Sequence, residues 1–191
     1  MLMRTLHVLA LLIAALQPPL TANAEQVSEY ELKTAYLYNF ALFVTWPAEN
    51  GKAITICTIG EDRFGSSIEQ LHNRKVRDKH LVVRRAINLE QAPACHMLYI
   101  AESERHNMPV ILGSLRGSSV LTISDAPSEG AALKEESDAL PAAVSAGIPL
   151  RSIITLILEN KKLMFEVDSA AAKQAGLTMS SRLLFLAKHV Y

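Results

Sequence analysis

With 191 residues, the chain is long enough to form one domain with a substantial hydrophobic core. Its 19 Lys and Arg residues balance 19 Asp and Glu residues, and hydrophobic residues make up 50% of the composition. This balance excludes the basic excess that nucleic-acid binding or attachment to an anionic membrane surface requires. We therefore expect no nucleic-acid partner.

Residues 1–24 have the pattern of a secretory signal peptide. Arg4 gives a positive start, residues 6–16 are apolar, and the last three residues fit a small-x-small cleavage site. We expect cleavage after Ala24 and export to the periplasm; the alternative is an uncleaved anchor. Cleavage would leave a single domain over residues 25–191 with one more acidic than basic residue.

The first element of this domain is a helix between Glu31 and Pro47. Apolar residues at offsets of three and four give it one apolar face, which further apolar residues widen. These residues are Leu32, Ala35, Tyr36, Phe40 and Phe43, with Leu37, Ala41 and Val44 beside them. Asn39 is the polar exception, and a buried asparagine needs hydrogen-bond partners. Pro47 ends the helix, because a residue before proline avoids the helical region.

Trp46 is the only tryptophan and lies at the exit of this helix. It is either a core anchor or part of a partner-binding surface.

Strands then alternate with helices through the centre of the chain. Strands are predicted at 53–59, 80–87, 96–100 and 118–124, helices at 64–71 and 105–113, a charged connector at 74–79, and a turn at 91–93. Such alternation predicts βαβ units and a mostly parallel sheet. We therefore expect an α/β fold, a Rossmann-like or flavodoxin-like three-layer sandwich.

The remaining residues do not continue this alternation of strands and helices. Residues 127–149 have no strong periodicity and read as an irregular insertion, and long loops in compact domains are often functional. The apolar stretches at 153–158 and 162–167 flank a short connection, which predicts a C-terminal β-hairpin. Asp168 is a suitable N-cap for a helix over 169–175. Ser180 caps a last amphipathic helix with apolar Leu183, Leu184, Leu186, Ala187 and Val190.

Three carboxylates follow predicted strands at their carboxyl ends, where ligands bind in open α/β sheets. Glu61 and Asp62 follow the first strand, and Asp125 follows the fourth. These three carboxylates, which we call the carboxyl rim, either bind a cation or small ligand or are simply solvated charges at the starts of loops. The loop that contains them and Arg63 begins at Gly60, whose backbone either approaches a ligand or simply makes the turn.

Enzyme motifs are missing from the sequence. It has no nucleophile elbow, no P-loop, no dinucleotide-binding glycine motif and no zinc-protease motif, and its histidines lack metal-ligand spacing. We expect no catalytic activity, no cofactor and no metal.

The two cysteines, Cys57 and Cys95, favour a disulfide in an exported protein. In a doubly wound sheet the first and third strands are neighbours, so the two residues could approach. The alternative is a pair of buried free thiols.

Motifs along most of the chain resemble those of the YfiR-like family of periplasmic proteins. The matching segments are K-T-A-Y-L-Y-N-F-A-L-F-V-T-W-P at 33–47, I-G-E-D-R-F-G at 59–65, C-H-M-L-Y-I at 95–100, L-T-I-S-D at 121–125, M-F-E-V-D-S-A-A-A at 164–172 and G-L-T-M-S-S-R-L-L-F-L-A at 176–187. Three departures stand out. Asp168 stands where the family usually has asparagine, and Met164 stands where the family often has arginine. Residues 127–149 replace a short Gly-Gly link of the family.

This resemblance implies regulation rather than catalysis. YfiR-like proteins bind the periplasmic sensor part of an inner-membrane diguanylate cyclase and lower cyclic-di-GMP. An outer-membrane OmpA-like lipoprotein can sequester them, they form homodimers, and their disulfides affect stability. We take Trp46, Glu61, Asp62, Arg63 and Asp125 as candidate partner or ligand residues. The alternative function is a periplasmic small-ligand sensor that uses the carboxyl rim and residues 127–149.

Overall fold

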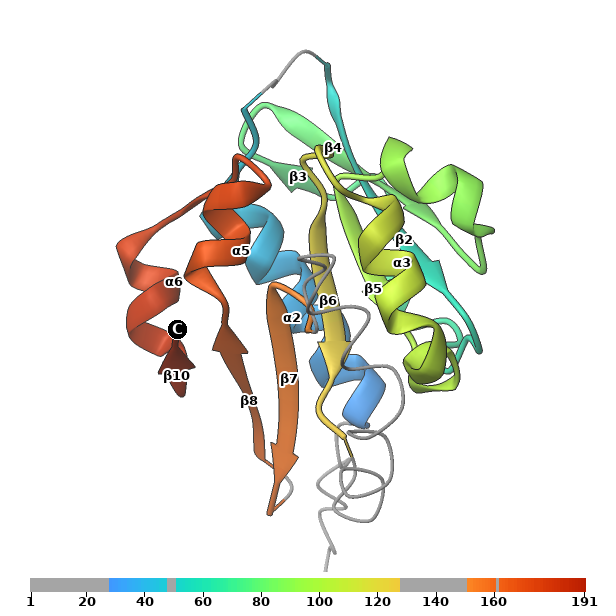
Figure 1. Cartoon of the computed structure of the whole chain (residues 1–191). Helices are drawn as coiled ribbons and strands as arrows, with labels where there is room; N and C mark the ends of the chain where they lie inside the picture. The colour runs from blue at the N-terminus through green and yellow to red at the C-terminus, as the bar shows by residue number, and fades with distance from the viewer. Residues whose placement is uncertain (1–27, 48–50, 128–150, 161) are drawn as a thin grey trace, which may run out of the picture.

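The structure, a computed structural model, describes residues 28–47, 51–127, 151–160 and 162–191. The predicted signal peptide, and all but the first residue of the predicted insertion, lie outside these residues. An eight-stranded sheet has the order β10-β8-β7-β6-β5-β2-β4-β3 (Figure 1). Its strands are β2 (Ala53–Ile59), β3 (Lys75–Val76), β4 (Lys79–Arg84), β5 (Met97–Ile100), β6 (Leu121–Asp125), β7 (Ile154–Glu159), β8 (Lys162–Val167) and β10 (His189–Val190).

Five neighbouring strands, β4-β2-β5-β6-β7, pair in parallel, and β8 returns antiparallel to β7. Counted along the chain without the short β3, the parallel strands have the order 2-1-3-4-5, which is the flavodoxin-like arrangement. The predicted fold class is therefore confirmed, including the C-terminal hairpin.

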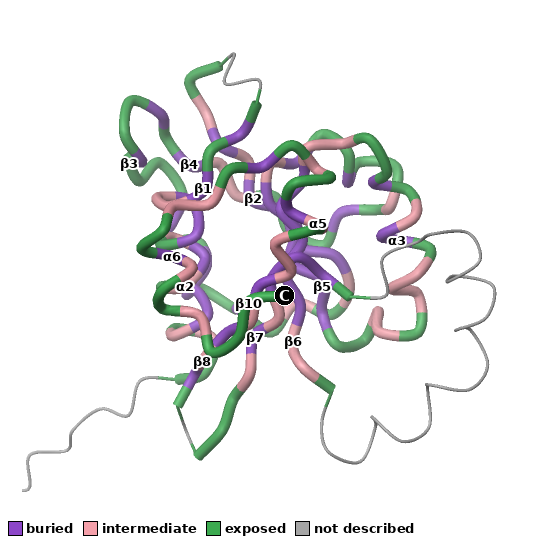
Figure 2. Tube along the Cα trace, turned by 60° about the vertical axis from the view of Figure 1, so that its left-hand side comes forward, coloured by how far each residue is buried: buried purple, intermediate pink, exposed green. Residues whose placement is uncertain are grey.

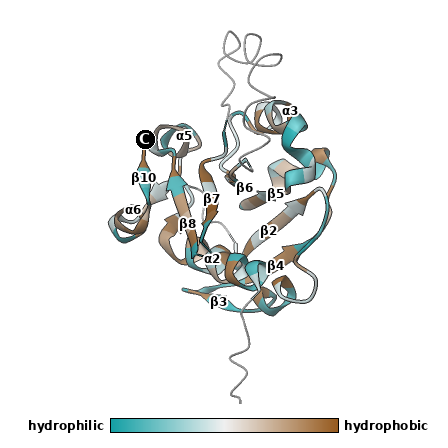
Figure 3. Cartoon of the chain, turned by 90° about the horizontal axis from the view of Figure 1, so that it is seen from below, coloured by the Kyte–Doolittle hydropathy of each residue, from teal (hydrophilic) through white to brown (hydrophobic). Residues whose placement is uncertain are grey.

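Helices cover both faces of the sheet. One face packs against α2 (Glu29–Phe43) and the 3₁₀ helix η2 (Ile68–Leu71), and the other against α3 (Met108–Ser114) and the 3₁₀ helix η3 (Leu89–Ala94). Side chains alternate between these cores: Tyr99 belongs to the first, and Leu98 and Ile100 to the second. The central strands are accordingly buried, and α2 and α3 lie on opposite sides of β2 and β5 (Figures 2 and 3).

Helix α2 begins at a capping box, in which Ser28 and Glu31 satisfy each other's backbone amides. Its fully buried stripe contains Leu37, Phe40 and Ala41. The predicted face was partly wrong, because Ala35 is exposed and Asn39, expected to be buried, is exposed as well. Of the buried stripe, Phe40 was predicted on that face, whereas Leu37 and Ala41 were predicted only as residues that widen it.

The end of α2 differs from the prediction. The helix stops at Phe43, because Val44–Thr45 form strand β1, which pairs antiparallel with β9 (Thr178–Met179). This two-stranded ribbon ties the N-terminal helix to the C-terminal segment, a contact between distant parts of the sequence that local periodicity does not contain.

Several other elements are shorter than predicted. The helix expected at 64–71 is only η2, and the one expected at 105–113 is divided into η4 (Glu102–Asn107) and α3. The predicted connector contains β3, which turns back on β4 through Arg77 at φ 57°. The predicted turn at 91–93 lies within η3.

The C-terminal helix also ends early. Helix α5 (Ser169–Gln174) follows β8 as expected, and Asp168 caps it by accepting the Ala171 N–H at 2.8 Å. Helix α6 (Ser181–Leu186) then stops, and β10 adds in parallel to β8. Val190, predicted to lie on the buried face of the helix, is instead exposed in this outermost strand.

Candidate functional site

The three carboxylates of the predicted rim do not form one site. Glu61 pairs with Arg63 at 3.0 Å on the exposed surface. Asp62 pairs with Arg85 and also accepts the Phe64 N–H at 3.0 Å. Asp125 takes part in a separate network described below. Among the described residues, no group of three His, Cys, Asp or Glu side chains is placed to hold a metal ion.

Protein atoms pack closely against Gly60, at the carboxyl end of β2, where flavodoxin-like sheets bind ligands between the first and third parallel strands, here β2 and β5. Gly60 follows β2 at φ +90°, and a Cβ there would lie 2.6 Å from the Ser103 Oγ. The Glu61 N–H donates to the same hydroxyl at 2.8 Å. The positive φ of Gly60 favours the alternative that it simply makes the turn, and its missing Cβ also permits close packing of η4 against the strand.

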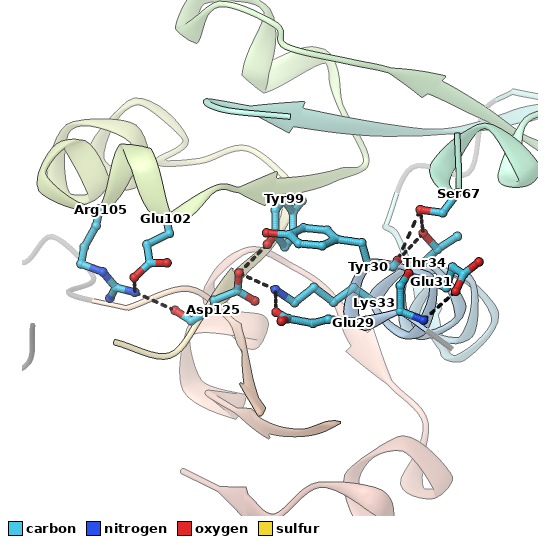
Figure 4. A network of polar contacts seen from close by, with 11 residues as sticks. Glu29, Tyr30, Glu31, Lys33, Thr34, Ser67, Tyr99, Glu102, Arg105 and Asp125 are labelled. Atoms are coloured by element: carbon cyan, nitrogen blue, oxygen red, sulfur yellow. Dashed lines mark hydrogen bonds and ion pairs between the residues drawn. The ribbon is translucent and has the colours of Figure 1, made fainter. Parts of the chain in front are cut away.

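Asp125 is the centre of a buried ionic network (Figure 4). Its Oδ2 accepts hydrogen bonds from Lys33 Nζ at 2.8 Å and from the Tyr99 hydroxyl at 2.5 Å. Lys33 also pairs with Glu29 at 2.5 Å, and its ammonium lies 4.4 Å from the Tyr30 ring centroid. The network joins α2 to the carboxyl ends of β5 and β6.

The pKa values of two side chains in this network, those of Lys33 and Tyr99, are raised. Burial alone would lower the pKa of Lys33, but the Asp125 and Glu29 carboxylates outweigh it and raise that pKa. Burial, reinforced by the charge of Asp125, strongly raises the pKa of Tyr99. A lysine that stays protonated is no nucleophile and a tyrosine that stays protonated is no base. The hydrogen bond that Lys33 donates to Asp125 attaches α2 to the sheet, and the one that Tyr99 donates joins β5 to β6 at the same carboxylate.

The sequence analysis missed Lys33 and Tyr99. The side chain of Lys33 is only 3% exposed. It lies four positions before Leu37 and therefore continues the buried stripe of α2. That spacing was a usable signal: a lysine in line with fully buried residues requires an anionic partner.

Trp46 is buried, at 4% exposure, and anchors the chain after β1. Its Nε1–H donates to the His96 carbonyl at 2.9 Å, and its ring meets the His96 ring edge-on at 5.9 Å between centroids. His96 Nδ1 in turn accepts the Thr55 N–H at 3.1 Å. This burial favours the core-anchor interpretation, since little of the indole is available to a partner.

Cys57 and Cys95 form a disulfide with a Cα–Cα distance of 6.0 Å. Cys57 lies in β2, and Cys95 lies two residues before the neighbouring strand β5, which agrees with the prediction that the first and third strands are neighbours. Both cysteines belong to the core beneath α3 and η3.

We expect the disulfide to stabilise the domain. It closes a sequence separation of 38 residues, for which the chain-entropy model gives about 4 kcal/mol, and native disulfides typically contribute about 2–4 kcal/mol. Urea unfolding of the oxidised protein should therefore show this difference from the Cys57→Ala/Cys95→Ala variant. Reductant should destabilise only the parent protein; two alkylatable thiols in natively exported protein would contradict the prediction.

Exposed apolar side chains are concentrated in the C-terminal segment, in α6 and around β10. Six large hydrophobic side chains are exposed among the described residues, and four of them fall within the last seven positions. We call these four the C-terminal apolar surface: Phe185 at 87% exposure, Leu186 at 59%, Val190 at 45% and Tyr191 at 56%. Two come from α6, and Val190 comes from β10, the outermost strand of the sheet, at one edge of the molecule (Figure 1).

This surface offers two means of association. Its side chains can bury apolar area against a partner, and exposed apolar patches on soluble domains often mark such contacts. Its edge strand can also pair with an added strand. Within the described ranges, no helix has the length and hydrophobicity needed to cross a bilayer.

Among the solved structures that resemble this chain are two weak likenesses. A conserved domain protein from Vibrio cholerae O1 biovar El Tor aligns with a TM-score of 0.47 and 12% identity, over 86% of this chain and 60% of that chain. The ABC domain in complex with L-Trp from Streptococcus pneumoniae aligns with a TM-score of 0.46 and 9% identity, over 85% and 60%. This chain thus spans about 60% of the length of each.

No curated protein matches the sequence. The family model described as YfiR/HmsC-like, however, matches residues 30–188, which is most of the chain. That range contains the buried Lys33–Asp125 network, the disulfide and Trp46. The chain therefore belongs to the YfiR/HmsC-like family.

Proposed function

We propose that the protein is a non-catalytic periplasmic regulator that binds the periplasmic sensor part of an inner-membrane diguanylate cyclase and inhibits it. Membership of the YfiR/HmsC-like family supports, at family level, a periplasmic regulator of diguanylate cyclase. The observation that carries the proposal for this chain is the C-terminal apolar surface. A surface of this kind favours a protein partner, whereas Ser103 packs directly against Gly60 at the sheet edge where a ligand would be expected.

Inhibition must act through the conformation of the cyclase. An exported protein cannot reach a cytoplasmic catalytic domain, so it has to bind one state of the periplasmic sensor more tightly than another. Its effect cannot exceed that difference in affinity. The same surface would serve a homodimer or an OmpA-like lipoprotein, which would then compete with the cyclase for it. Export through residues 1–24 is part of this proposal.

Phe185→Ser should weaken binding to the cyclase sensor by about 30-fold, the effect of losing a hot-spot aromatic worth about 2 kcal/mol. Because Phe185 is 87% exposed, the stability should change by no more than about 0.5 kcal/mol. The measurement is affinity for membranes that contain the cyclase, together with cyclic-di-GMP in a deletion strain that carries each variant. Deletion should raise cyclic-di-GMP, and the parent gene should lower it again.

Val110→Ser is the matched control. Val110 is also an exposed apolar residue, at 61%, but it lies on α3 and outside the C-terminal apolar surface. It should bind and repress like the parent. If Phe185→Ser also represses fully, the docking surface is wrong. If deletion leaves cyclic-di-GMP unchanged while the cyclase is expressed, the regulatory function itself is wrong.

A further inference from the structure

A cavity of about 130 Å³ lies between α3 and α5, over the amino-terminal ends of β6 and β7. Its apolar wall includes Leu112 and Leu115 from the α3 side, Ile153 from the sheet and Ala175 from the α5 side. The alanine is small, which leaves the space open. This location is opposite to the carboxyl rim, where the sequence analysis looked for a ligand.

The C-terminal hairpin explains this placement. In a doubly wound sheet each strand leads into its loop at the carboxyl edge, so sites gather there. Here β8 runs antiparallel to β7, and it therefore delivers α5 to the amino edge. The turn that follows α3 reaches the same edge before β6 begins. The two helices thus enclose a cavity that the parallel part of the fold would not create.

The cavity is cationic as well as apolar. Among the described residues, its lining contains two arginines, Arg116 and Arg151, and no acidic residue. The Arg151 guanidinium lies 5.1 Å from the ring centroid of Tyr191, and the Tyr191 carbonyl is held by the Ser169 N–H at 2.9 Å. The Arg151 guanidinium can leave the Tyr191 ring and bind the carboxylate of a ligand. A charge-assisted, bidentate hydrogen bond to a carboxylate is stronger than an exposed cation–π contact.

We propose that this cavity binds a small carboxylate with a compact apolar body, and that Arg151 holds the anionic group. The size limits the apolar part: an apolar cavity of about 150 Å³ accommodates benzene, so a branched short chain or a single ring fits. The apolar body lies against the leucines and Ala175, and the carboxylate remains at the arginine edge.

Calorimetric titration of the purified mature protein with benzoate and 3-methylbutanoate tests the site. At least one acid should bind saturably, and its neutral amide should bind at least tenfold more weakly. Arg151→Gln should weaken binding of the acid at least tenfold. Ala175→Leu should abolish binding by filling the cavity without changing any charge. Arg182→Gln is the matched control, because Arg182 also lies over an aromatic ring, that of Phe43, but does not line the cavity.

The outcomes are decisive in both directions. Absence of saturable binding by both acids overturns the site, and equal affinity for acid and amide overturns the role of the arginine. Should Ala175→Leu fail to fold, the affinities of the parent protein for the acid and for its amide still test the proposal. Binding that survives in a folded Ala175→Leu variant places the ligand elsewhere and overturns the proposal. None of these measurements depends on the cyclase.

Discussion

Asp125→Ala should lower the free energy of unfolding by about 3 kcal/mol. Removing one member of a buried ion pair typically costs about 3–5 kcal/mol, because the other charge remains buried without compensation. Lys33 is 3% exposed and would keep only Glu29, whose own side chain is 40% exposed, so we expect the lower end of that range. The Tyr99 hydroxyl would lose its acceptor as well. Urea unfolding followed by circular dichroism measures the change.

Two further variants distinguish the loss of the buried ion pair from an unspecific loss of stability. Lys33→Met/Asp125→Leu removes both charges and leaves apolar groups, so it should be far less destabilised than Asp125→Ala. Glu61→Ala removes a carboxylate from an exposed pair and should change stability by less than about 1 kcal/mol. An Asp125→Ala protein as stable as the parent would show that the network does not hold α2 on the sheet.

The pH dependence of this network follows from the raised pKa of Lys33. A lysine whose pKa is higher in the folded state gives stability that is fully present below its ordinary pKa. That stability is lost only as the pH rises through the folded-state value, so the loss begins above about 10.5, the ordinary pKa of lysine. Across the neutral range the contribution of Lys33 should therefore be constant.

The sequence predicted the fold class and the neighbouring positions of the first and third strands, because both follow from the alternation of strands and helices along the chain. Buried β-branched strands separated by turn residues define βαβ units, and short connections then limit the arrangement. The disulfide followed from the same reasoning, since Cys57 lies on one of these neighbouring strands and Cys95 lies two residues before the other.

The polar network was harder to predict because its partners are distant. Lys33 and Asp125 are separated by 92 positions, and nothing local links them. The buried stripe of α2 could have identified Lys33 as a residue in need of a carboxylate, but Glu61, Asp62 and Asp125 were all available. Only the position of α2 across the ends of β5 and β6 selects Asp125.

The C-terminal apolar surface was missed for a different reason. Leu186 and Val190 fit a helical pattern and were placed on a buried face. In the structure the helix ends at Leu186, and the chain leaves it to pair with β8. That pairing leaves Val190 exposed. Leu186 and Val190, which were predicted to be buried, are therefore exposed in the structure. A tertiary contact overrode the local pattern here.

Trp46→Ala should lower the free energy of unfolding by about 3–5 kcal/mol, as truncation of large core side chains does. The indole is 4% exposed, so its removal leaves a cavity, and it also removes a donor from the His96 carbonyl at 2.9 Å. That carbonyl retains the Leu121 N–H at 2.9 Å, so it is not left without a partner. The loss should therefore come mainly from packing.

Trp46→Phe separates the contribution of packing from that of the hydrogen bond to the His96 carbonyl. Phenylalanine keeps an aromatic ring but has no N–H, so a cost well below that of Trp46→Ala would assign most of the effect to packing, with about 1 kcal/mol for the hydrogen bond. Unfolding and binding to cyclase-containing membranes should be measured on the same samples. At temperatures where Trp46→Ala remains folded, it should bind the partner like the parent. Parent-like stability combined with lost binding would contradict the core-anchor role and place Trp46 on the partner surface.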